Sequence, residues 1–362
     1  MIPSKMPVLR SLLDKIEDKI DKLNPWHKDE PPQQPPPITT RTAILLLSLY
    51  ALIYFLPFYL SSQTRPSPTL TRDAPSAIRA RVRSVTISCI ICCTSTYLIL
   101  SRTAHASIYD TLHFMGVYPP ALLSSTSSLL LTALLFLGPL FEYFVVEAGW
   151  RDWTSSPSFG PLREVLSEWT SWRNIIAGPI TEELLYRSAS VPLMLLSQSP
   201  VKTTIFLSPV IFGLSHLHHF YEFRLTHPQV PLAAAILRSI FQFGYTTLFG
   251  SYATFIYIRT GSLLAVCLVH AFCNAMGLPR FYGRVEPYPV PAVDSAVTTG
   301  SAARPGGAGS RSRSRNRVLL WTIAYYTLLV IGAASWYKNL SRLTDSTNAL
   351  VPNSAFSSSN AA

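Results

Sequence analysis

Two adjacent glutamates and an arginine interrupt an otherwise apolar stretch between residues 175 and 197. The stretch is long enough to cross a bilayer as a helix, and each charge inside it costs about 2.5–3.5 kcal/mol on insertion scales. Glu183 and Arg187 are four residues apart, so one helical turn separates them and we expect an ion pair. Glu182 points about 100° away on the same helix and has no partner at that spacing. The position of Glu182 therefore needs a functional explanation.

Two other apolar segments carry polar residues at helical spacing. His216 follows Phe212 by four residues, and His270 precedes Asn274 by four. Residues four apart project from one face of a helix, so the imidazole and carboxamide of the second pair can be aimed at one atom. Two such donors suit the oxyanion of a tetrahedral intermediate. A single buried histidine or glutamate is usually structural, but polar groups on three apolar segments favour one shared site.

These residue types are sufficient to hydrolyse a peptide bond without a covalent nucleophile. Burial raises the pKa of a carboxylate toward neutrality, so Glu182 can act as general base on a water that His216 orients. His270 and Asn274 would then hold the developing negative charge. Two alternatives stay open. Glutamate and histidine also suit zinc or iron, although the HExxH motif is absent, and Cys273 is a candidate thiol nucleophile.

The composition places these residues in a membrane protein. Of the 362 residues, 48% are hydrophobic and 14% are charged, with a mean hydropathy of +0.26, whereas soluble domains carry about 25% charged residues. We predict an all-α, polytopic membrane helix bundle with about eight transmembrane helices. They are expected at residues 43–62, 84–101, 121–146, 175–197, 203–219, 232–258, 262–278 and 318–337.

Proline, glycine and arginine refine this layout. Pro57 and the Gly138-Pro139 pair are expected to kink the first and third helices. The arginines before the second helix, including Arg79, Arg81 and Arg83, are assigned to a basic loop. The net charge of +11 comes with no nucleic-acid-binding motif. We therefore expect the basic loops to meet the lipid bilayer surface, with no nucleic-acid partner.

Polar segments flank and interrupt the membrane core. We expect residues 1–42 to form a polar, amphipathic arm with a Pro-rich linker, and residues 43–278 to form the core. Residues 279–317 form a Gly/Ser/Arg-rich insertion that we expect to be disordered. The last transmembrane helix, 318–337, precedes a polar tail, 338–362.

The polar motifs together resemble those of a known enzyme family. The matching residues are Glu182-Glu183-x-x-x-Arg187, Phe212-x-x-x-His216 and His270-x-x-x-Asn274, in this order. They resemble the type II CAAX prenyl endopeptidases, also called Ras-and-a-factor-converting enzymes, within the wider ABI (CPBP) family of intramembrane glutamate proteases. The resemblance extends over about residues 43–337, and its flanks include Gly178-Pro179-Ile180-Thr181, His218-His219 and Arg72-Asp73-x-Pro75.

The resemblance implies an activity and a role for each matching residue. The enzyme would cut after the prenylated cysteine of a CaaX tail and release the last three residues. Glu182 would be the general base, His216 would help to activate water, and His270 and Asn274 would stabilise the transition state. Glu183 and Arg187 would support these four.

The resemblance also implies substrates, a cofactor state and a location. The chemistry would depend on glutamate, with no cofactor and no obligatory metal. The substrates would be prenylated CaaX proteins such as Ras-like small GTPases and mating-factor-like precursors, processed by a multi-pass protein of the endoplasmic reticulum membrane. Two other interpretations remain open. One is an ABI-family membrane protease with a non-prenylated substrate. The other is a non-enzymatic transporter or scaffold that uses Glu182, His216 and His270 as a proton relay.

Overall fold

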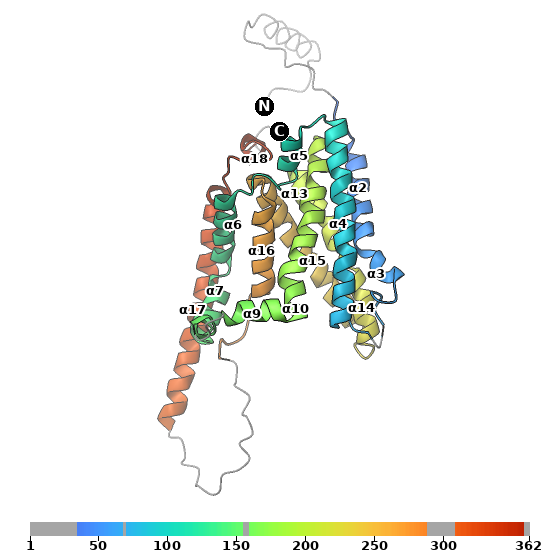
Figure 1. Cartoon of the computed structure of the whole chain (residues 1–362). Coiled ribbons are helices and arrows are strands. Elements are labelled where there is room, and N and C mark those ends of the chain that lie inside the picture. Colours follow the sequence, from blue (N-terminus) through green and yellow to red (C-terminus); the bar gives the residue numbers. More distant parts are fainter. Residues whose placement is uncertain (1–34, 68–69, 155–158, 288–307, 358–362) are drawn as a thin grey trace, which may run out of the picture. The chain divides into compact units, whose positions relative to one another are not determined.

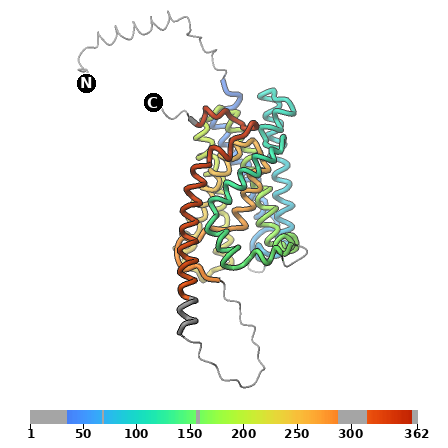
Figure 2. Tube along the Cα trace, turned by 90° about the vertical axis from the view of Figure 1, so that its left-hand side faces the viewer, coloured from blue at the N-terminus to red at the C-terminus, as the bar shows by residue number. Residues whose placement is uncertain are grey.

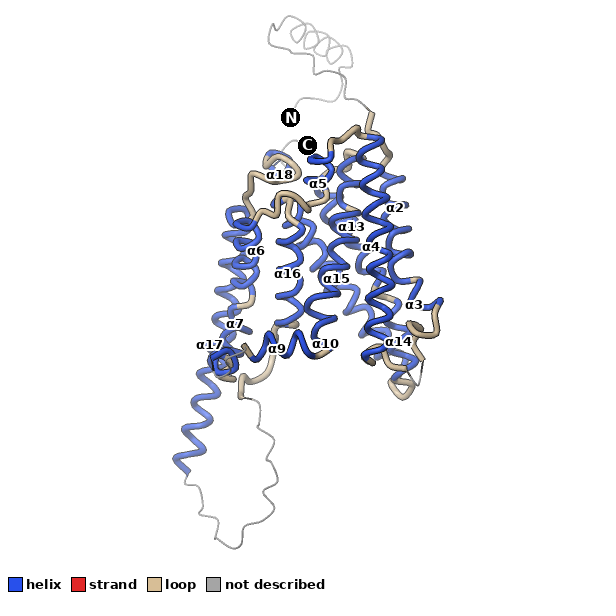
Figure 3. Tube along the Cα trace, viewed as in Figure 1, coloured by secondary structure: helices blue, strands red, loops and turns tan. Residues whose placement is uncertain are grey.

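The structure is a computed structural model that describes residues 35–67, 70–154, 159–287 and 308–357. The chain divides into two units, residues 1–36 and 37–362, and all the helices described below belong to the second. Every regular element of the described residues is a helix (Figure 3). The expected all-α membrane bundle is thus confirmed as a fold class. The amphipathic helix expected in the N-terminal arm and most of the expected insertion lie outside the described residues.

The second unit is built from seven long helices joined by short ones. The long helices are α2 (Thr40–Phe55), α4 (Pro75–Thr103), α6 (Leu122–Leu135), α13 (Val201–Ser215), α15 (Leu232–Thr260), α16 (Leu263–Met276) and α17 (Ala308–Leu343). The α-helical short segments are α3 (Pro57–Leu60), α5 (Ile108–Phe114), α7 (Leu137–Phe141), α8 (Trp150–Thr154), α9 (Gly160–Ser167), α10 (Trp169–Trp172), α11 (Gly178–Glu183), α12 (Val191–Leu196), α14 (His218–Thr226) and α18 (Ser354–Ser357). Three further segments are π-helical, namely η1 (Glu142–Val146), η2 (Arg173–Ala177) and η3 (Leu184–Ala189).

The helices of this unit stand side by side in one bundle. Helices α2 and α4 form one side, α6 and α17 form the opposite side, and α13, α15 and α16 lie between them (Figure 1). The view turned by 90° shows the same upright packing (Figure 2). The short helices α9 and α10 run across the lower end of the bundle, where α14 also lies (Figure 1).

Fewer single helices span a membrane than the sequence predicts. Among the described residues, four helices are long and apolar enough to cross, and the bent pair of α6 with α7–η1 would make a fifth. The prediction was about eight. Helices α13 and α16 have 15 and 14 residues, which at about 1.5 Å per residue is shorter than a hydrocarbon core of about 30 Å.

Prolines break two of the spans as predicted. Helix α2 ends at Phe55 and α3 begins at Pro57. Helix α6 ends at Leu135, and the chain bends by 80° before continuing through α7 and η1. Pro139 explains the second break, because its ring clashes with the carbonyl four residues earlier, at Leu135.

Three boundaries differ from the prediction. The expected basic loop is wrong at Arg79, Arg81 and Arg83, because α4 already begins at Pro75. Helix α17 begins at Ala308, inside the expected insertion, and ends at Leu343. The chain after α17 packs against the end of α15, where the Leu350 N–H donates to the Ile258 carbonyl (2.9 Å).

The segment that carries the two glutamates is held by hydrogen bonds from its neighbours. The Thr96 hydroxyl of α4 donates to the Ala189 carbonyl (2.8 Å), and the Cys89 thiol donates to the Thr181 carbonyl (3.2 Å).

Helices α13 and α15 meet at glycines. A Cβ on Gly213 would lie 2.1 Å from the Thr247 hydroxyl. Small residues such as Gly213 allow this close approach between α13 and α15.

Candidate active site

Glu183 lies at the centre of a fully buried cluster of charges. Its Oε1 lies 3.1 Å from Nη1 of Arg187 and 2.7 Å from Nδ1 of His270. The predicted ion pair with Arg187 is therefore confirmed, and both side chains are at most 1% exposed. Arg187 Nη2 also donates to the Gly250 carbonyl (3.1 Å). Because a carboxylate only accepts hydrogen bonds, Nδ1 of His270 carries the proton in the contact with Glu183.

Glu182 occupies a more open position than Glu183. Its side chain is 23% exposed, and its Oε2 lies 3.8 Å from Nε2 of His270. His270 therefore stands between the two glutamates, with one ring nitrogen directed at each. The hydroxyl of Thr181, next to Glu182, pairs with the Tyr54 hydroxyl of α2 (2.9 Å). These contacts hold the carboxylate of Glu182 at the edge of the buried cluster.

His216 lies where α13 ends, and its ring is fixed by the same helix. Its Nδ1 lies 2.8 Å from the Phe212 carbonyl, which can only accept a hydrogen bond. The proton therefore sits on Nδ1, and the lone pair of Nε2 remains available to a water or a substrate.

Asn274 lies near the end of α16, one turn beyond His270. Its Nδ2 donates to the backbone carbonyl of Asn174 in η2 (2.8 Å). This bond ties α16 to the segment that precedes the glutamates. The amide group has a second N–H, so it keeps one donor for another acceptor.

Three of the four predicted catalytic residues line one cavity. Glu182, His216 and Asn274 all border a cavity of about 170 Å³ at the end of the bundle where α13 and α16 stop and α4 begins. His270 is not part of this lining and lies behind Glu182, where it is 5% exposed. The spacing argument placed His270 and Asn274 on one face of α16, but only Asn274 faces the cavity.

The cavity wall contains residues that the sequence reasoning did not assign to the site. They come from the loop before α4, from η2 and from the start of α14, and include Arg72, Arg173, Asn174, His218 and His219. Two tyrosines, Tyr54 and Tyr186, complete the polar part of the lining. The signals in the sequence were the Arg72-Asp73-x-Pro75 and His218-His219 motifs, whose spacing says nothing about which helices they face.

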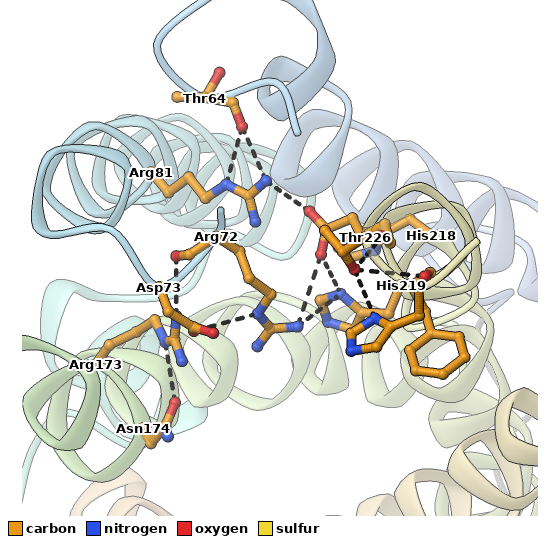
Figure 4. A network of polar contacts seen from close by, with 12 residues as sticks. Thr64, Arg72, Asp73, Arg81, Arg173, Asn174, His218, His219 and Thr226 are labelled. Carbon is orange, nitrogen blue, oxygen red and sulfur yellow. Dashed lines mark hydrogen bonds and ion pairs between the residues drawn. The ribbon is translucent and has the colours of Figure 1, made fainter. Parts of the chain in front are cut away.

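An ion-pair network supports this wall (Figure 4). Glu222 of α14 lies 2.6 Å from Nη2 of Arg81 and 2.9 Å from Nδ1 of His219. Burial alone would raise the pKa of the Glu222 carboxyl, but the His219 hydrogen bond and the Arg81 charge lower it below its usual range. Burial lowers the pKa of His218 to about 4. The network is therefore built from an ionised carboxylate and neutral histidines.

The three His218, His219 and Glu222 side chains lie close enough to hold a metal ion, with ligand atoms within 4.8 Å of one another. They fit a cation poorly, because Arg81 already pairs with the Glu222 carboxylate at 2.6 Å and Arg72 lies 3.7 Å from it. The hydrolytic step is therefore derived without a metal ion. The thiol alternative also loses its geometric basis, since Cys273 packs against an apolar cluster and does not line the Glu182 cavity.

A second, larger cavity lies on the other face of the same segment. It has a volume of about 1220 Å³ and is lined mostly by apolar side chains, among them Ile175, Ile180, Leu268 and Phe272. At its edge Glu142 pairs with Arg280 (2.8 Å). The pair neutralises the charge of Glu142 where this residue borders the apolar cavity.

Comparison with known proteins identifies the family of this chain. Residues 164–276 match the family described as type II CAAX prenyl endopeptidase Rce1-like. The chain is 34% identical to a probable CAAX prenyl protease 2 of Schizosaccharomyces pombe over 293 residues, which are 81% of this chain and 90% of the relative. It is 30% identical to CAAX prenyl protease 2 of Saccharomyces cerevisiae, with 83% and 96% covered, and 33% identical to that of Homo sapiens, with 60% and 66% covered. No solved structure gives a significant match.

A helical membrane bundle with a carboxylate, a histidine and an asparagine around one cavity defines a class of membrane-embedded hydrolase. The relatives named above show which family of membrane-embedded hydrolases this chain represents. The chain belongs to the type II CAAX prenyl endopeptidase family.

Proposed function

We propose that Glu182 is the general base with which this chain hydrolyses prenylated CaaX proteins. The protein is a CAAX prenyl endopeptidase, a membrane hydrolase, as its membership of the family and its relatives' names indicate. The observation that carries the assignment of the base is that Glu182 lines a cavity together with His216 and Asn274. Glu183 is fully buried and engaged by two partners, so it has no comparable access to substrate.

The hydrolytic step needs one proton acceptor and one orienting group. Glu182 takes a proton from a water held against the lone pair of His216 Nε2, and the water oxygen bonds to the carbonyl carbon of the prenylated cysteine. Glu182 then returns the proton to the nitrogen of the released tripeptide as the C–N bond breaks. Because Nδ1 of His216 is committed to the Phe212 carbonyl, the ring presents Nε2 in one orientation.

The negative charge of the tetrahedral intermediate needs donors. The second N–H of Asn274 supplies one. His270 does not border the cavity and acts on the step through Glu182, because its Nδ1 donates to Glu183 at 2.7 Å and its Nε2 faces Glu182 at 3.8 Å. It is therefore a positioning residue for the base. Glu183 and Arg187 thus support His270 without touching substrate.

The larger cavity suits the lipid of the substrate. It adjoins the Glu182 cavity along two stretches of chain. Asn174 and Asn274 face the polar cavity, whereas their neighbours Ile175 and Ala275 face the apolar one. A prenyl chain gains about 0.8 kcal/mol for each carbon removed from water. The peptide and the lipid of one substrate can therefore occupy adjoining surfaces of different polarity.

We further propose that the natural substrates are Ras-like small GTPases and mating-factor-like precursors, and that the protein resides in the endoplasmic reticulum membrane. These proposals follow from the family and can be tested by fractionation and by the accumulation of unprocessed substrates after deletion. A protease for non-prenylated substrates and a proton-relay scaffold are the competing functions, and the names of the relatives do not favour either.

The test is release of the tripeptide from a farnesylated CaaX peptide, with an unprenylated twin measured in parallel. We expect the full-length chain to cleave the farnesylated peptide and Glu182→Gln to lose this activity. Equal cleavage of both peptides would overturn the prenyl assignment. Undiminished activity of Glu182→Gln would overturn the assignment of the base.

A further inference from the structure

The wall of the polar cavity holds positive charge that the hydrolytic step does not use. The guanidinium groups of Arg72, Arg81 and Arg173 all line the cavity. The carboxylates that pair with them are Asp73 and Glu222. Asp73 and Glu222 thus supply two carboxylates for three guanidinium groups, and the carboxylate that lines the cavity, Glu182, is the one assigned to the hydrolytic step.

Two of the three arginines are each held by a close carboxylate. Arg81 Nη2 lies 2.6 Å from Glu222, and the same guanidinium donates twice to the Thr64 carbonyl (2.9 and 3.0 Å). Arg173 Nη1 lies 2.8 Å from Asp73, and its Nε donates to the side chain of Asn174 (3.0 Å). The charge of each is therefore neutralised at short range.

Arg72 is the arginine of the three that has no carboxylate closer than 3.7 Å. It is 3.8 Å from Asp73 and 3.7 Å from Glu222, and both carboxylates are bound more closely by other groups. Arg72 Nη1 lies 3.2 Å from Nδ1 of His219. That nitrogen gives its proton to Glu222 at 2.9 Å, so it cannot also accept one from Arg72. Figure 4 shows Arg72 between Asp73 and His219. The side chain of Arg72 is 38% exposed.

We propose that Arg72 binds the terminal α-carboxylate of the CaaX tail. This inference rests on the proposed function and adds to it the group that recognises the free end of the substrate. The tail beyond the scissile bond is three residues long, which spans about 10 Å when extended. The recognising cation must therefore border the cavity that contains Glu182, as Arg72 does. A guanidinium matches a carboxylate in shape and charge and can donate two parallel hydrogen bonds to it.

The test compares two farnesylated CaaX peptides that differ only at the C-terminus, one a free acid and one a carboxamide. A hydrogen bond between charged groups gives a preference of about 10- to 100-fold. We expect kcat/KM of the full-length chain to favour the acid by this factor. Arg72→Gln should reduce the acid-to-amide ratio to about 3 or less, and Arg72→Lys should retain part of it.

The ratio is the readout because a loss of folded protein lowers both rates equally. Arg83→Gln is the matched control: Arg83 is an exposed arginine of the same helix as Arg81 and does not line the cavity. It should keep the wild-type ratio. Equal cleavage of acid and amide by the wild-type chain would overturn the role of Arg72 while leaving the peptidase function standing. A fall of both rates by one factor in Arg72→Gln would also overturn it. Cleavage of neither peptide would reject the proposed function itself.

Product inhibition gives a second measure that needs no variant. The released tripeptide as free acid should inhibit the wild-type chain about 10-fold or more better than its carboxamide. Equal inhibition by both would contradict the proposal.

Discussion

The cavity that contains Glu182 and the larger cavity beside it share two walls, the helical run 171–182 and α16, yet opposite kinds of side chain line them. The first has a volume of about 170 Å³ and brings together a carboxylate, three histidines and three arginines. The second is about 1220 Å³ and mainly apolar, with Glu142, Glu147 and Glu164 as the carboxylates of its lining. In η2, Asn174 lines the first cavity and the next residue, Ile175, lines the second. In α16, Asn274 lines the first cavity and Ala275 lines the second.

The difference indicates how a membrane enzyme can separate chemistry from lipid binding. Charges buried in a bilayer are costly unless they pair or meet water. Glu182, His216 and Asn274 reach one cavity from three helical segments, which leaves other faces of α11 and α16 free to border the apolar cavity. The comparison predicts that substitutions in the polar cavity change turnover, whereas substitutions in the apolar cavity change the affinity for prenylated substrate.

The largest effect is expected at Glu182. Glu182→Gln keeps the shape of the side chain but removes the proton acceptor, so kcat should fall by about 10³-fold. The matched control is Glu164→Gln, an exposed carboxylate that borders the apolar cavity, and it should stay within about 2-fold of wild type. A comparable loss in both variants would remove the distinction between the cavities.

Asn274→Ala should give the next largest loss. Without the carboxamide one donor to the tetrahedral intermediate disappears, and kcat should fall by about 10²-fold while KM changes little. Asn339→Ala is the control, because Asn339 donates within α17, to the Ser335 carbonyl, and lines neither cavity. A change in KM alone would indicate that Asn274 binds substrate without stabilising the transition state.

Filling the apolar cavity should weaken binding of the lipid. Leu268 lines this cavity and is 38% exposed, so Leu268→Trp reduces the space available and should raise KM for a farnesylated peptide about 10-fold. Leu237→Trp, at a leucine of α15 that is 68% exposed and lines neither cavity, serves as control. If kcat falls and KM does not, the apolar cavity is not the lipid site.

The histidines of the polar wall should make stability depend on pH. The folded state holds the pKa of His218 at about 4, below the value of about 6.5 expected for the unfolded chain. The stabilising effect of the neutral ring is complete above pH 6.5 and is lost as pH falls toward 4, about 2 kcal/mol of it by pH 5. Thermal unfolding in detergent at pH 7.5 and pH 5 should show a smaller drop in Tm for His218→Gln than for wild type. An unchanged drop would refute this role of His218.

Removal of metal should have the smallest effect. Dialysis against EDTA is expected to leave tripeptide release unchanged, because Glu222, the carboxylate among the three side chains that lie close enough to hold an ion, already pairs with Arg81 and lies 3.7 Å from Arg72. Loss of activity that zinc restores would reverse this assignment.

Local sequence features predicted much of this architecture. The Glu183–Arg187 pair and the breaks near Pro57 and Pro139 follow from spacing and from proline sterics. Hydropathy also predicted a helical membrane protein, although it overestimated the number of full spans because α13 and α16 are too short.

Other features depend on packing between distant segments. The contact between Asp73 and Arg173 joins residues 100 positions apart, and no periodicity places Arg72 beside Glu182. Helical spacing put His270 on the same face as Asn274, but it did not predict that the His270 ring turns toward Glu183. The packing of neighbouring helices determines these contacts and side-chain orientations.

The most direct test is an experimental structure with a farnesylated CaaX peptide whose scissile bond is replaced by a non-cleavable isostere. The account predicts that the isostere lies within about 3 Å of Glu182 and Asn274, with the farnesyl chain in the apolar cavity. An isostere bound in the apolar cavity near Glu142, or a lipid chain seated outside both cavities, would contradict it.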